Sequence, residues 1–108
     1  MQTLTAQSFH AEIAKSLLPL IVDYWADWCQ PCKMLAPVFE KLSHEFAGTL
    51  TFAKLDIDLA PEIAQEFDIR GIPCMIVFKN GKEVDRLVGA MSENVLREKI
   101  NDAVKKPA

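Results

Sequence analysis

Hydrophobic residues recur along this chain at two spacings, which predict helices interleaved with buried strands. Ser8 is a typical helix N-cap, and Phe9, Ile13 and Leu17 follow it at helical spacing. The next segment, Leu20 to Ala26, is short and nearly all apolar. Such a run is typical of a strand that is buried on both faces. The beginning of the chain therefore predicts a helix followed by an interior strand.

A longer helix is predicted from Pro31 to Phe46. Pro37 lies inside this segment and should kink the helix, because proline removes one backbone donor and crowds the preceding turn. The apolar residues that share one face of this helix are Leu35, Val38, Phe39, Leu42 and Phe46.

The second half of the chain continues the alternation. Leu50 to Ile57 predicts a second interior strand, and Pro61 to Phe67 predicts a short helix with proline in its first turn. Met75 to Phe78 and Val84 to Val88 then flank Asn80-Gly81. This dipeptide strongly favours a two-residue hairpin turn, so the two flanking runs should pair as antiparallel strands.

A last helix is predicted after Ser92, which should cap it; its apolar face would carry Val95, Leu96, Ile100 and Ala103. The full order is strand–helix–strand–helix–strand–helix–strand–strand–helix. It predicts an α/β fold with one mixed sheet of about five strands flanked by about four helices. Strands joined through helices should run parallel, and those of the hairpin antiparallel.

Length and charge narrow the class of protein. A chain of 108 residues predicts a single domain, residues 1–108. The net charge of -3 argues against nucleic acid as the main partner, since phosphate binding needs a basic face. The longest apolar run, Leu17 to Val22, contains Pro19 and is far too short to cross a membrane. The N-terminus lacks the pattern of a signal peptide, so we expect a cytoplasmic monomer without membrane contact.

The chain has three cysteines, and two of them form the motif Cys29-Gln30-Pro31-Cys32. A secreted domain held by disulfides would usually carry more cysteines and an even number. The pair is therefore either catalytic or part of a metal site. Zinc needs four ligands, and only Cys74, His10 and His44 remain as candidates, with no second motif of the right spacing. We therefore expect no metal.

The position of the motif favours thiol chemistry. Cys29 and Cys32 follow a buried strand and begin a helix, three residues apart, so their side chains share one face. The unpaired N–H groups and the positive end of the helix dipole favour a thiolate at Cys29. The Cys29 thiolate would attack a substrate disulfide, and Cys32 would then attack Cys29 and release the reduced substrate. Pro31 should stiffen the turn between the two.

The segment from Trp25 to Lys33, Trp25-Ala26-Asp27-Trp28-Cys29-Gln30-Pro31-Cys32-Lys33, resembles the active site of the thioredoxin family. The likeness extends over nearly the whole chain. Its further landmarks are Asp23, Pro37, Lys54, Arg70-Gly71-Ile72-Pro73, Phe78-Lys79-Asn80-Gly81 and Val88-Gly89-Ala90. The resemblance implies the thioredoxin fold and the activity of a protein-disulfide reductase.

The resemblance also implies a role for Asp23, a carboxylate inside an apolar strand. Burial should raise its pKa. In the family the matching residue accepts a proton, so Asp23 would deprotonate Cys32 directly or through a water. From the residues alone, a structural ion pair with Lys54 is the alternative, and both roles are compatible. Lys54 would then tune the redox properties of the pair.

A docking surface for substrate follows from the same resemblance. Pro73 would be the family's cis-proline beside the dithiol, with the Ile72 backbone pairing to an extended substrate segment. Trp25 should pack beneath the active-site helix in a structural role, as should Pro37. The other residues expected on the docking surface are Trp28, Gly71, Gly89 and Ala90, the two glycines keeping the backbone uncluttered.

Two positions depart from the family pattern. Gln30 stands where glycine is usual, and residues between the cysteines tune the redox potential. This leaves a more oxidising disulfide exchanger or isomerase as an alternative function. Cys74 stands where threonine is usual, near the active site, and a buried, inert thiol is the favoured interpretation.

The sequence carries no dinucleotide-binding fingerprint, so we expect no bound cofactor. The resemblance implies electrons from an NADPH-dependent flavoprotein, a thioredoxin-reductase-like protein, and disulfide-containing proteins as clients. Beside a general reductase and an isomerase, a non-catalytic interaction module that uses the Trp28, Ile72 and Ala90 surface stays open.

Overall fold

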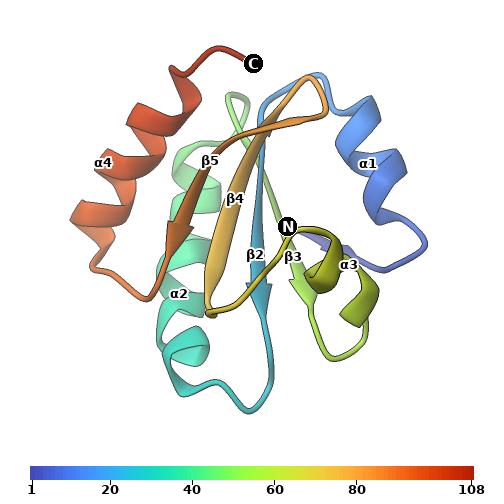
Figure 1. The fold of residues 1–108 in the computed structure, drawn as a ribbon. Helices are drawn as coiled ribbons and strands as arrows, with labels where there is room; N and C mark the ends of the chain where they lie inside the picture. Colours follow the sequence, from blue (N-terminus) through green and yellow to red (C-terminus); the bar gives the residue numbers. More distant parts are fainter.

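Nine elements follow one another in the order that the sequence predicts. The computed structural model describes residues 1–108. The elements are β1 (Gln2–Leu4), α1 (Phe9–Lys15), β2 (Leu20–Trp25), α2 (Gln30–Glu45), β3 (Thr51–Asp56), α3 (Pro61–Glu66), β4 (Cys74–Lys79), β5 (Lys82–Val88) and α4 (Glu93–Val104). Figure 1 shows them as one sheet with helices around it. None of the helices is long and apolar enough to cross a membrane.

The five strands form one mixed sheet in the order β1-β3-β2-β4-β5. The central strand β2 runs parallel to β3 and antiparallel to β4. The direction of β4 corrects a prediction, because β3 and β4 are joined through α3 and were expected to be parallel. Six helical residues rise only about 9 Å, half the length of a six-residue strand. The chain therefore enters β4 from the end of the sheet where β3 stops.

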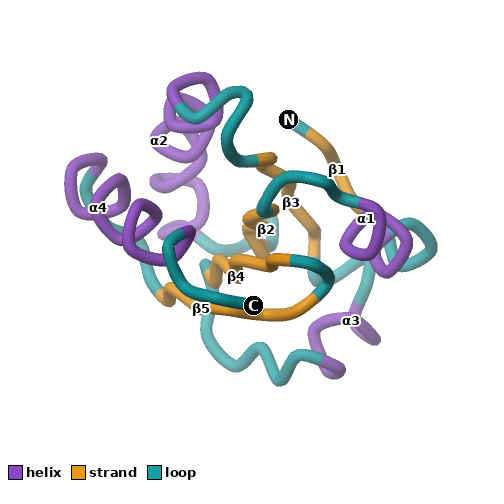
Figure 2. The backbone as a smooth tube through the Cα atoms, turned by 90° about the horizontal axis from the view of Figure 1, so that it is seen from above, coloured by secondary structure: helices purple, strands orange, loops and turns teal.

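The sheet separates two hydrophobic layers, each covered by two helices. Figure 2, which looks along the sheet, has α1 and α3 on one side and α2 and α4 on the other. Along β2, Val22 and Tyr24 belong to the α1/α3 layer, whereas Ile21 belongs to the α2/α4 layer. This alternation follows from the two-residue period of a strand. Asp23 follows Ile21 by two residues, so its side chain points to the same face of the sheet, toward α2.

The first helix is shorter than its apolar spacing predicts. Leu17 was expected on the buried stripe of α1, but the helix ends at Lys15 and the Leu17 side chain is fully exposed. The backbone turns extended at Ser16, and the Ser16 hydroxyl donates to the Leu18 carbonyl at 2.7 Å. Pro19 disfavours a helical conformation at the residue before it, so the helix has to end early.

The predicted turn and cap in the C-terminal part are confirmed. Asn80 and Gly81 both have positive φ angles, 52° and 78°, as a tight two-residue hairpin between β4 and β5 requires. The Ser92 hydroxyl accepts a hydrogen bond from the Val95 N–H at 3.3 Å and so caps α4.

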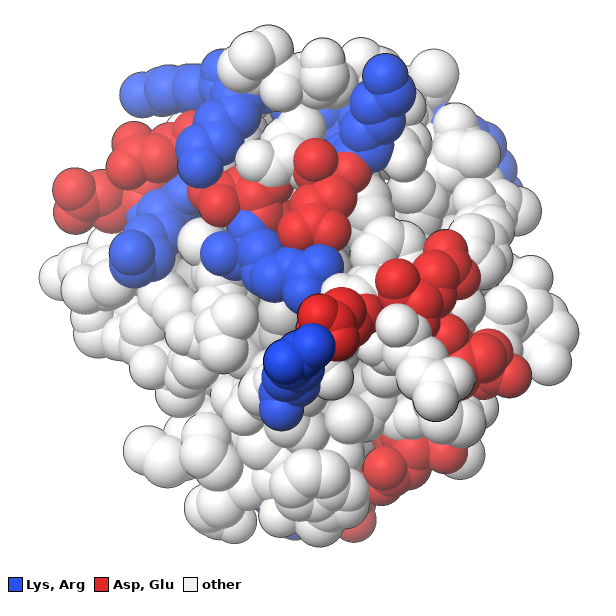
Figure 3. Space-filling view, viewed as in Figure 1, with Lys and Arg blue, Asp and Glu red and all other residues white.

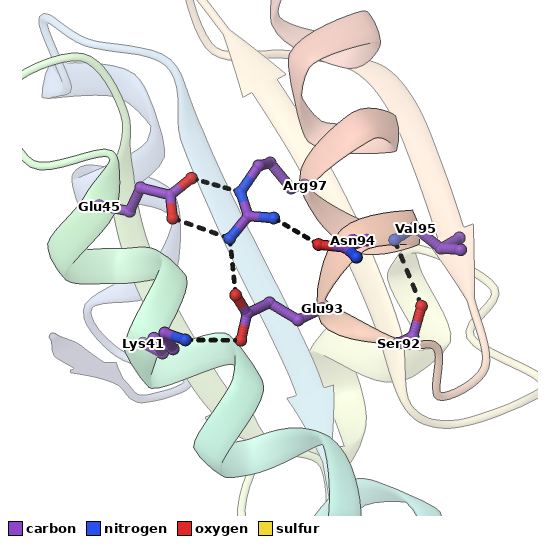
Figure 4. A network of polar contacts seen from close by, with 7 residues as sticks. All are labelled: Lys41, Glu45, Ser92, Glu93, Asn94, Val95 and Arg97. Atoms are coloured by element: carbon purple, nitrogen blue, oxygen red, sulfur yellow. Dashed lines mark hydrogen bonds and ion pairs between the residues drawn. The ribbon is translucent and has the colours of Figure 1, made fainter.

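Helices α2 and α4 are tied together by a charged network at the far end of α2 (Figure 4). The Arg97 guanidinium donates to both carboxylate oxygens of Glu45, at 2.5 and 2.9 Å, and to Glu93 at 2.7 Å. Lys41 pairs with Glu93 from the α2 side at 3.0 Å. Two residues of α2 and two of α4 thus hold the pair of helices in register over the sheet.

Candidate active site

The two cysteines lie where β2 leads into α2. Cys29 is the N-cap of α2 and Cys32 is in its first turn. They form a disulfide, with their Cα atoms 5.3 Å apart. Gln30 and Pro31 lie between them and are exposed. The reactive pair is therefore held at the end of a long helix, close to the surface.

The Cys29 sulfur accepts a hydrogen bond from the Cys32 backbone N–H at 3.2 Å. It also lies 3.8 Å from the carbonyl oxygen of Ile72. A sulfur at the N-cap takes the place of a capping oxygen, and an N–H donor aimed at it favours the negatively charged thiolate. In the disulfide form, Cys29 is 4% exposed and Cys32 is 2% exposed. The difference in exposure between the two sulfurs is thus small in this form.

Asp23 is buried beneath α2. Burial raises the pKa of its carboxyl group to about 7, and the positive charge of Lys54 partly opposes this rise. The Asp23 Oδ1 atom has no hydrogen-bond partner. Asp23 lines a recess of about 180 Å³ whose other walls are Met1, Ala36, Phe39, Glu40 and Lys54. A recess of this size with an unpaired carboxylate oxygen has room for water.

Lys54 lies beside Asp23 in the sheet and reaches toward a neighbouring ring. The two residues are paired in the register of β2 and β3. The Lys54 ammonium nitrogen lies 4.7 Å from the ring centroid of Trp25, which is a cation–π distance. Trp25 in turn packs against Ala26, Cys29 and Cys32. Lys54 therefore links the environment of the carboxylate to the residues that support the disulfide.

Trp28 stands next to the disulfide and is 69% exposed. Its indole Nε1 donates to the Asp58 carboxylate at 2.9 Å, which fixes the orientation of the ring. Asp58 lies 30 residues from Trp28 and belongs to the loop after β3. Sequence reasoning missed Asp58, because no local pattern links an acidic loop residue to a distant tryptophan.

A second chain segment, which contains Ile72, packs against the two cysteines. The peptide bond between Ile72 and Pro73 is cis, Pro73 is buried and Ile72 is half-buried. The Gly89 N–H donates to the Pro73 carbonyl at 2.8 Å, so the loop after β5 is joined to this segment. We define the docking face as Trp28, Gly71, Ile72, Pro73, Gly89 and Ala90.

The two glycines of the docking face differ. Gly89 has a φ angle of 97°, in the region that favours glycine. A Cβ atom at Gly71 would lie 3.6 Å from a methyl group of Val88, which is an ordinary contact. Packing within the chain therefore does not require glycine at position 71, and a docked partner would have to supply the reason for it.

Charged side chains are unevenly distributed over the surface. Lys, Arg, Asp and Glu gather in the upper half of the face drawn in Figure 3, whereas the lower left is white. The N-terminal end of α2 lies at the lower end of the same view in Figure 1. The lower left of this view, toward the N-terminal end of α2, is thus uncharged, whereas atoms of Asp and Glu lie at the lower right.

The third cysteine is a buried free thiol. Cys74 pairs with Tyr24 across β2 and β4 and is not part of a disulfide. Burial raises the pKa of the Cys74 thiol to about 11, which keeps it protonated and unreactive at neutral pH. No group of three or more His, Cys, Asp or Glu side chains gathers in a way that could hold a metal ion.

Comparison with known proteins agrees with this geometry. The thioredoxin family model matches residues 1–102. A thioredoxin of Mycobacterium tuberculosis is 46% identical over 100 residues, which are 93% of this chain and 86% of that protein. A thioredoxin of Chlorobaculum thiosulfatiphilum is 43% identical, with 93% of each chain covered. A bifunctional thioredoxin reductase/thioredoxin of Mycobacterium leprae is 47% identical, and this chain spans 22% of its length.

Proposed function

The chain belongs to the thioredoxin family and is a dithiol–disulfide oxidoreductase, and we propose that it reduces protein disulfides with Cys29 as nucleophile and Cys32 as resolving thiol. The observation that carries this assignment is the Cys29–Cys32 disulfide at the N-terminus of α2, with the Cys32 N–H aimed at the Cys29 sulfur. That donor stabilises a thiolate at Cys29 and not at Cys32. The asymmetry between the two sulfurs defines the order of the steps.

The reaction begins from the reduced pair. The Cys29 thiolate attacks one sulfur of the client disulfide, which forms a mixed disulfide and expels the other client sulfur as a thiolate. Cys32 loses its proton and attacks Cys29, which forms the Cys29–Cys32 disulfide and releases the second client thiolate. Two electrons have passed to the client, and the two client thiolates take up protons. A further two electrons and two protons return the protein to the dithiol.

Asp23 is the base that we assign to Cys32. The unpaired Oδ1 atom leaves the carboxylate free to take up a proton, and the adjoining recess opens it to water. A pKa of about 7 lets the carboxylate accept a proton and release it again near neutral pH. Lys54 adjusts this pKa by its charge, and Trp25 keeps Lys54 in place.

Clients are expected to bind across the docking face in an extended conformation. The Ile72 carbonyl is 3.8 Å from the Cys29 sulfur, so a client backbone paired with Ile72 would bring its own sulfur close to Cys29. Trp28, which directly precedes Cys29, provides an exposed apolar surface. Gln30 and Pro31, exposed between the two cysteines, would touch the client as well and tune the potential of the pair.

The electrons that regenerate the dithiol would come from an NADPH-dependent flavoprotein reductase. The relative from Mycobacterium leprae carries the names thioredoxin reductase and thioredoxin in one chain, which supports such a pairing. We propose a cytoplasmic, monomeric protein, because a secreted domain held by disulfides would usually carry more than three cysteines.

The assignment is tested with purified protein, insulin as client and dithiothreitol as electron donor. Cys29→Ala is expected to abolish insulin reduction, because no nucleophile remains. Cys74→Ala is the matched control, since it removes the same atoms from a cysteine outside the disulfide, and it should keep turnover. Full activity of the Cys29 variant, or equal loss in both, would contradict the assignment.

A further inference from the structure

Two methionines line one recess next to the docking face. The recess measures about 350 Å³ and is formed by Met34, Leu35, Ala90, Met91 and Ser92; we call it the methionine recess. Met34 belongs to α2 and is 66% exposed. Met91 is half-buried in the loop between β5 and α4. Both methionines therefore line a single, mostly apolar hollow, Met34 from the exposed side and Met91 from the side that packs against the α2/α4 layer.

This recess continues the surface that clients use. Ala90 belongs to both the recess and the docking face, and Met34 follows Cys32 by only two residues. The loop before α4 and the start of α2 lie toward the same end of the molecule in Figure 1. A client segment that crosses the disulfide toward Ala90 would therefore rest on the two methionines. Their flexible, polarizable side chains suit contacts with varied apolar groups.

The same side chains are open to oxidation. Hydrogen peroxide transfers one oxygen atom to a thioether, which yields methionine sulfoxide and water, so the sulfur is oxidised by two electrons and the peroxide is reduced. The sulfoxide is polar and hydrogen-bonding, where the thioether was apolar. Oxidation of Met34 or Met91 would thus change the character of the recess without touching the cysteines.

We propose that Met34 and Met91 form a peroxide-sensitive modification site, and that their oxidation to sulfoxides weakens the docking of protein clients. The proposal rests on the assigned protein-disulfide reductase function, since it concerns the surface used by that activity. The exchange chemistry at Cys29 and Cys32 stays intact, because no sulfur of the dithiol is altered. The change is reversible by methionine sulfoxide reductases.

The experiment starts from protein with the Cys29–Cys32 disulfide formed, so that peroxide finds no reactive thiol; Cys74 is buried. After treatment and removal of peroxide, dithiothreitol restores the dithiol but does not reduce sulfoxides. Peptide mass spectrometry is expected to find one added oxygen on Met34 and on Met91. Met75 is fully buried and serves as the internal control that should stay unmodified.

Kinetics then separate docking from chemistry. For insulin we expect KM to rise about fivefold after oxidation, with kcat nearly unchanged, because a polar sulfoxide weakens apolar contacts. A small aromatic disulfide that does not reach the recess should be reduced at the same rate before and after treatment. Treatment with methionine sulfoxide reductases should return KM to its starting value.

A double variant, Met34→Leu with Met91→Leu, is the matched protein. It keeps the apolar volume but offers no thioether in the recess, while the exposed Met1 stays oxidisable. Its own KM, whatever its value, should not change on peroxide treatment. Unmodified Met34 and Met91, or an unchanged KM in fully oxidised wild-type protein, would overturn the proposal. Untreated protein that fails to reduce insulin would instead overturn the assigned function.

Discussion

The two ends of helix α2 are built by different means. At the N-terminal end, no acidic residue occupies the first turn, and Cys29 is the cap. At the C-terminal end, Lys41 and Glu45 are engaged in the charged network with α4. A carboxylate in the first turn would stabilise a helix, because it compensates the positive end of the dipole. Because no carboxylate is present in the first turn of α2, the positive end of the dipole acts on the Cys29 sulfur.

The comparison indicates how stability and reactivity are separated along one helix. The N-terminal end has no carboxylate to compensate the helix dipole, and the Cys32 N–H donates one hydrogen bond to the Cys29 sulfur. The distant end adds paired charges, while buried side chains lie along both halves of the helix. Such a division predicts that substitutions at the far end change stability, whereas those near the dithiol change chemistry.

The largest loss of stability is expected from Leu42→Ala, at a buried position of α2. Leu42 is fully buried in the α2/α4 layer, and its truncation should lower the free energy of unfolding by about 3 kcal/mol. Met34→Ala, at an exposed position in the first half of the same helix, should change it by less than about 0.5 kcal/mol. Urea denaturation followed by far-UV circular dichroism measures both. Equal losses would contradict the burial of Leu42 in this layer and the exposure of Met34.

Asp23→Asn should raise stability and lower activity. The folded-state pKa of about 7 lies above that of an unfolded aspartate, so the folded state holds its proton to higher pH. Stability is thus highest below the unfolded pKa and falls as pH rises toward 7. Asparagine removes this loss, and at pH 8 the variant should be about 2 to 4 kcal/mol more stable than wild type.

The same substitution removes the proposed base for Cys32, and insulin reduction at pH 7 should fall by about tenfold. Denaturation at pH 5 and at pH 8 provides the control for stability, because the difference between variant and wild type should shrink at the lower pH. A constant difference across this range would mean that Asp23 does not titrate as inferred.

Much of the fold could be predicted from local pattern. The hairpin at Asn80-Gly81 and the cap at Ser92 depend on a few adjacent residues, and both are present. The end of α1 and the direction of β4 were wrong. To predict the end of α1, the effect of Pro19 has to be weighed against the helical spacing of Leu17. To predict the direction of β4, the length of α3 has to be compared with the length of a strand.

The candidate site also contains features that local sequence predicts and features that it does not. The disulfide between Cys29 and Cys32 follows from sequence spacing, because three residues at a helix start fix the approach of the sulfurs. The bond from Trp28 to Asp58 joins residues 30 positions apart. The methionine recess likewise unites α2 with a loop more than 50 residues further on. Such contacts depend on how the elements pack and carry no local signal.

Gln30→Gly tests the reactive end with a smaller change. Gln30 is exposed, so glycine removes few contacts but adds backbone freedom to the reduced pair. Closing the disulfide should then be less favourable by about 0.5 kcal/mol, which makes the potential more positive by about 10 mV. Equilibration against glutathione measures it. A much larger shift would mean that the Gln30 side chain itself stabilises one redox state.

The smallest effect is expected at the far end, from Arg97→Ala. The Arg97 guanidinium lowers the pKa of Glu45 and of Glu93 through hydrogen bonds, so its stabilising effect is present above the ordinary carboxyl range and is lost as pH falls through the lowered values. The melting temperature at pH 7 should fall by a few degrees, and less at high salt, because the network is near the surface. The difference from wild type should shrink as pH falls through the lowered pKa values of the two carboxyl groups.

Arg70→Ala is the matched control for this network. Arg70 pairs only with Asp68, two residues away, so the substitution breaks no contact between helices. The melting temperature should stay nearly unchanged. The Cys29–Cys32 potential should be the same in Arg97→Ala as in wild type, because Arg97 contacts only the far end of α2. A shift in that potential for Arg97→Ala would mean that the two ends of the helix are coupled, since the change would have travelled through Pro37 to the sulfurs.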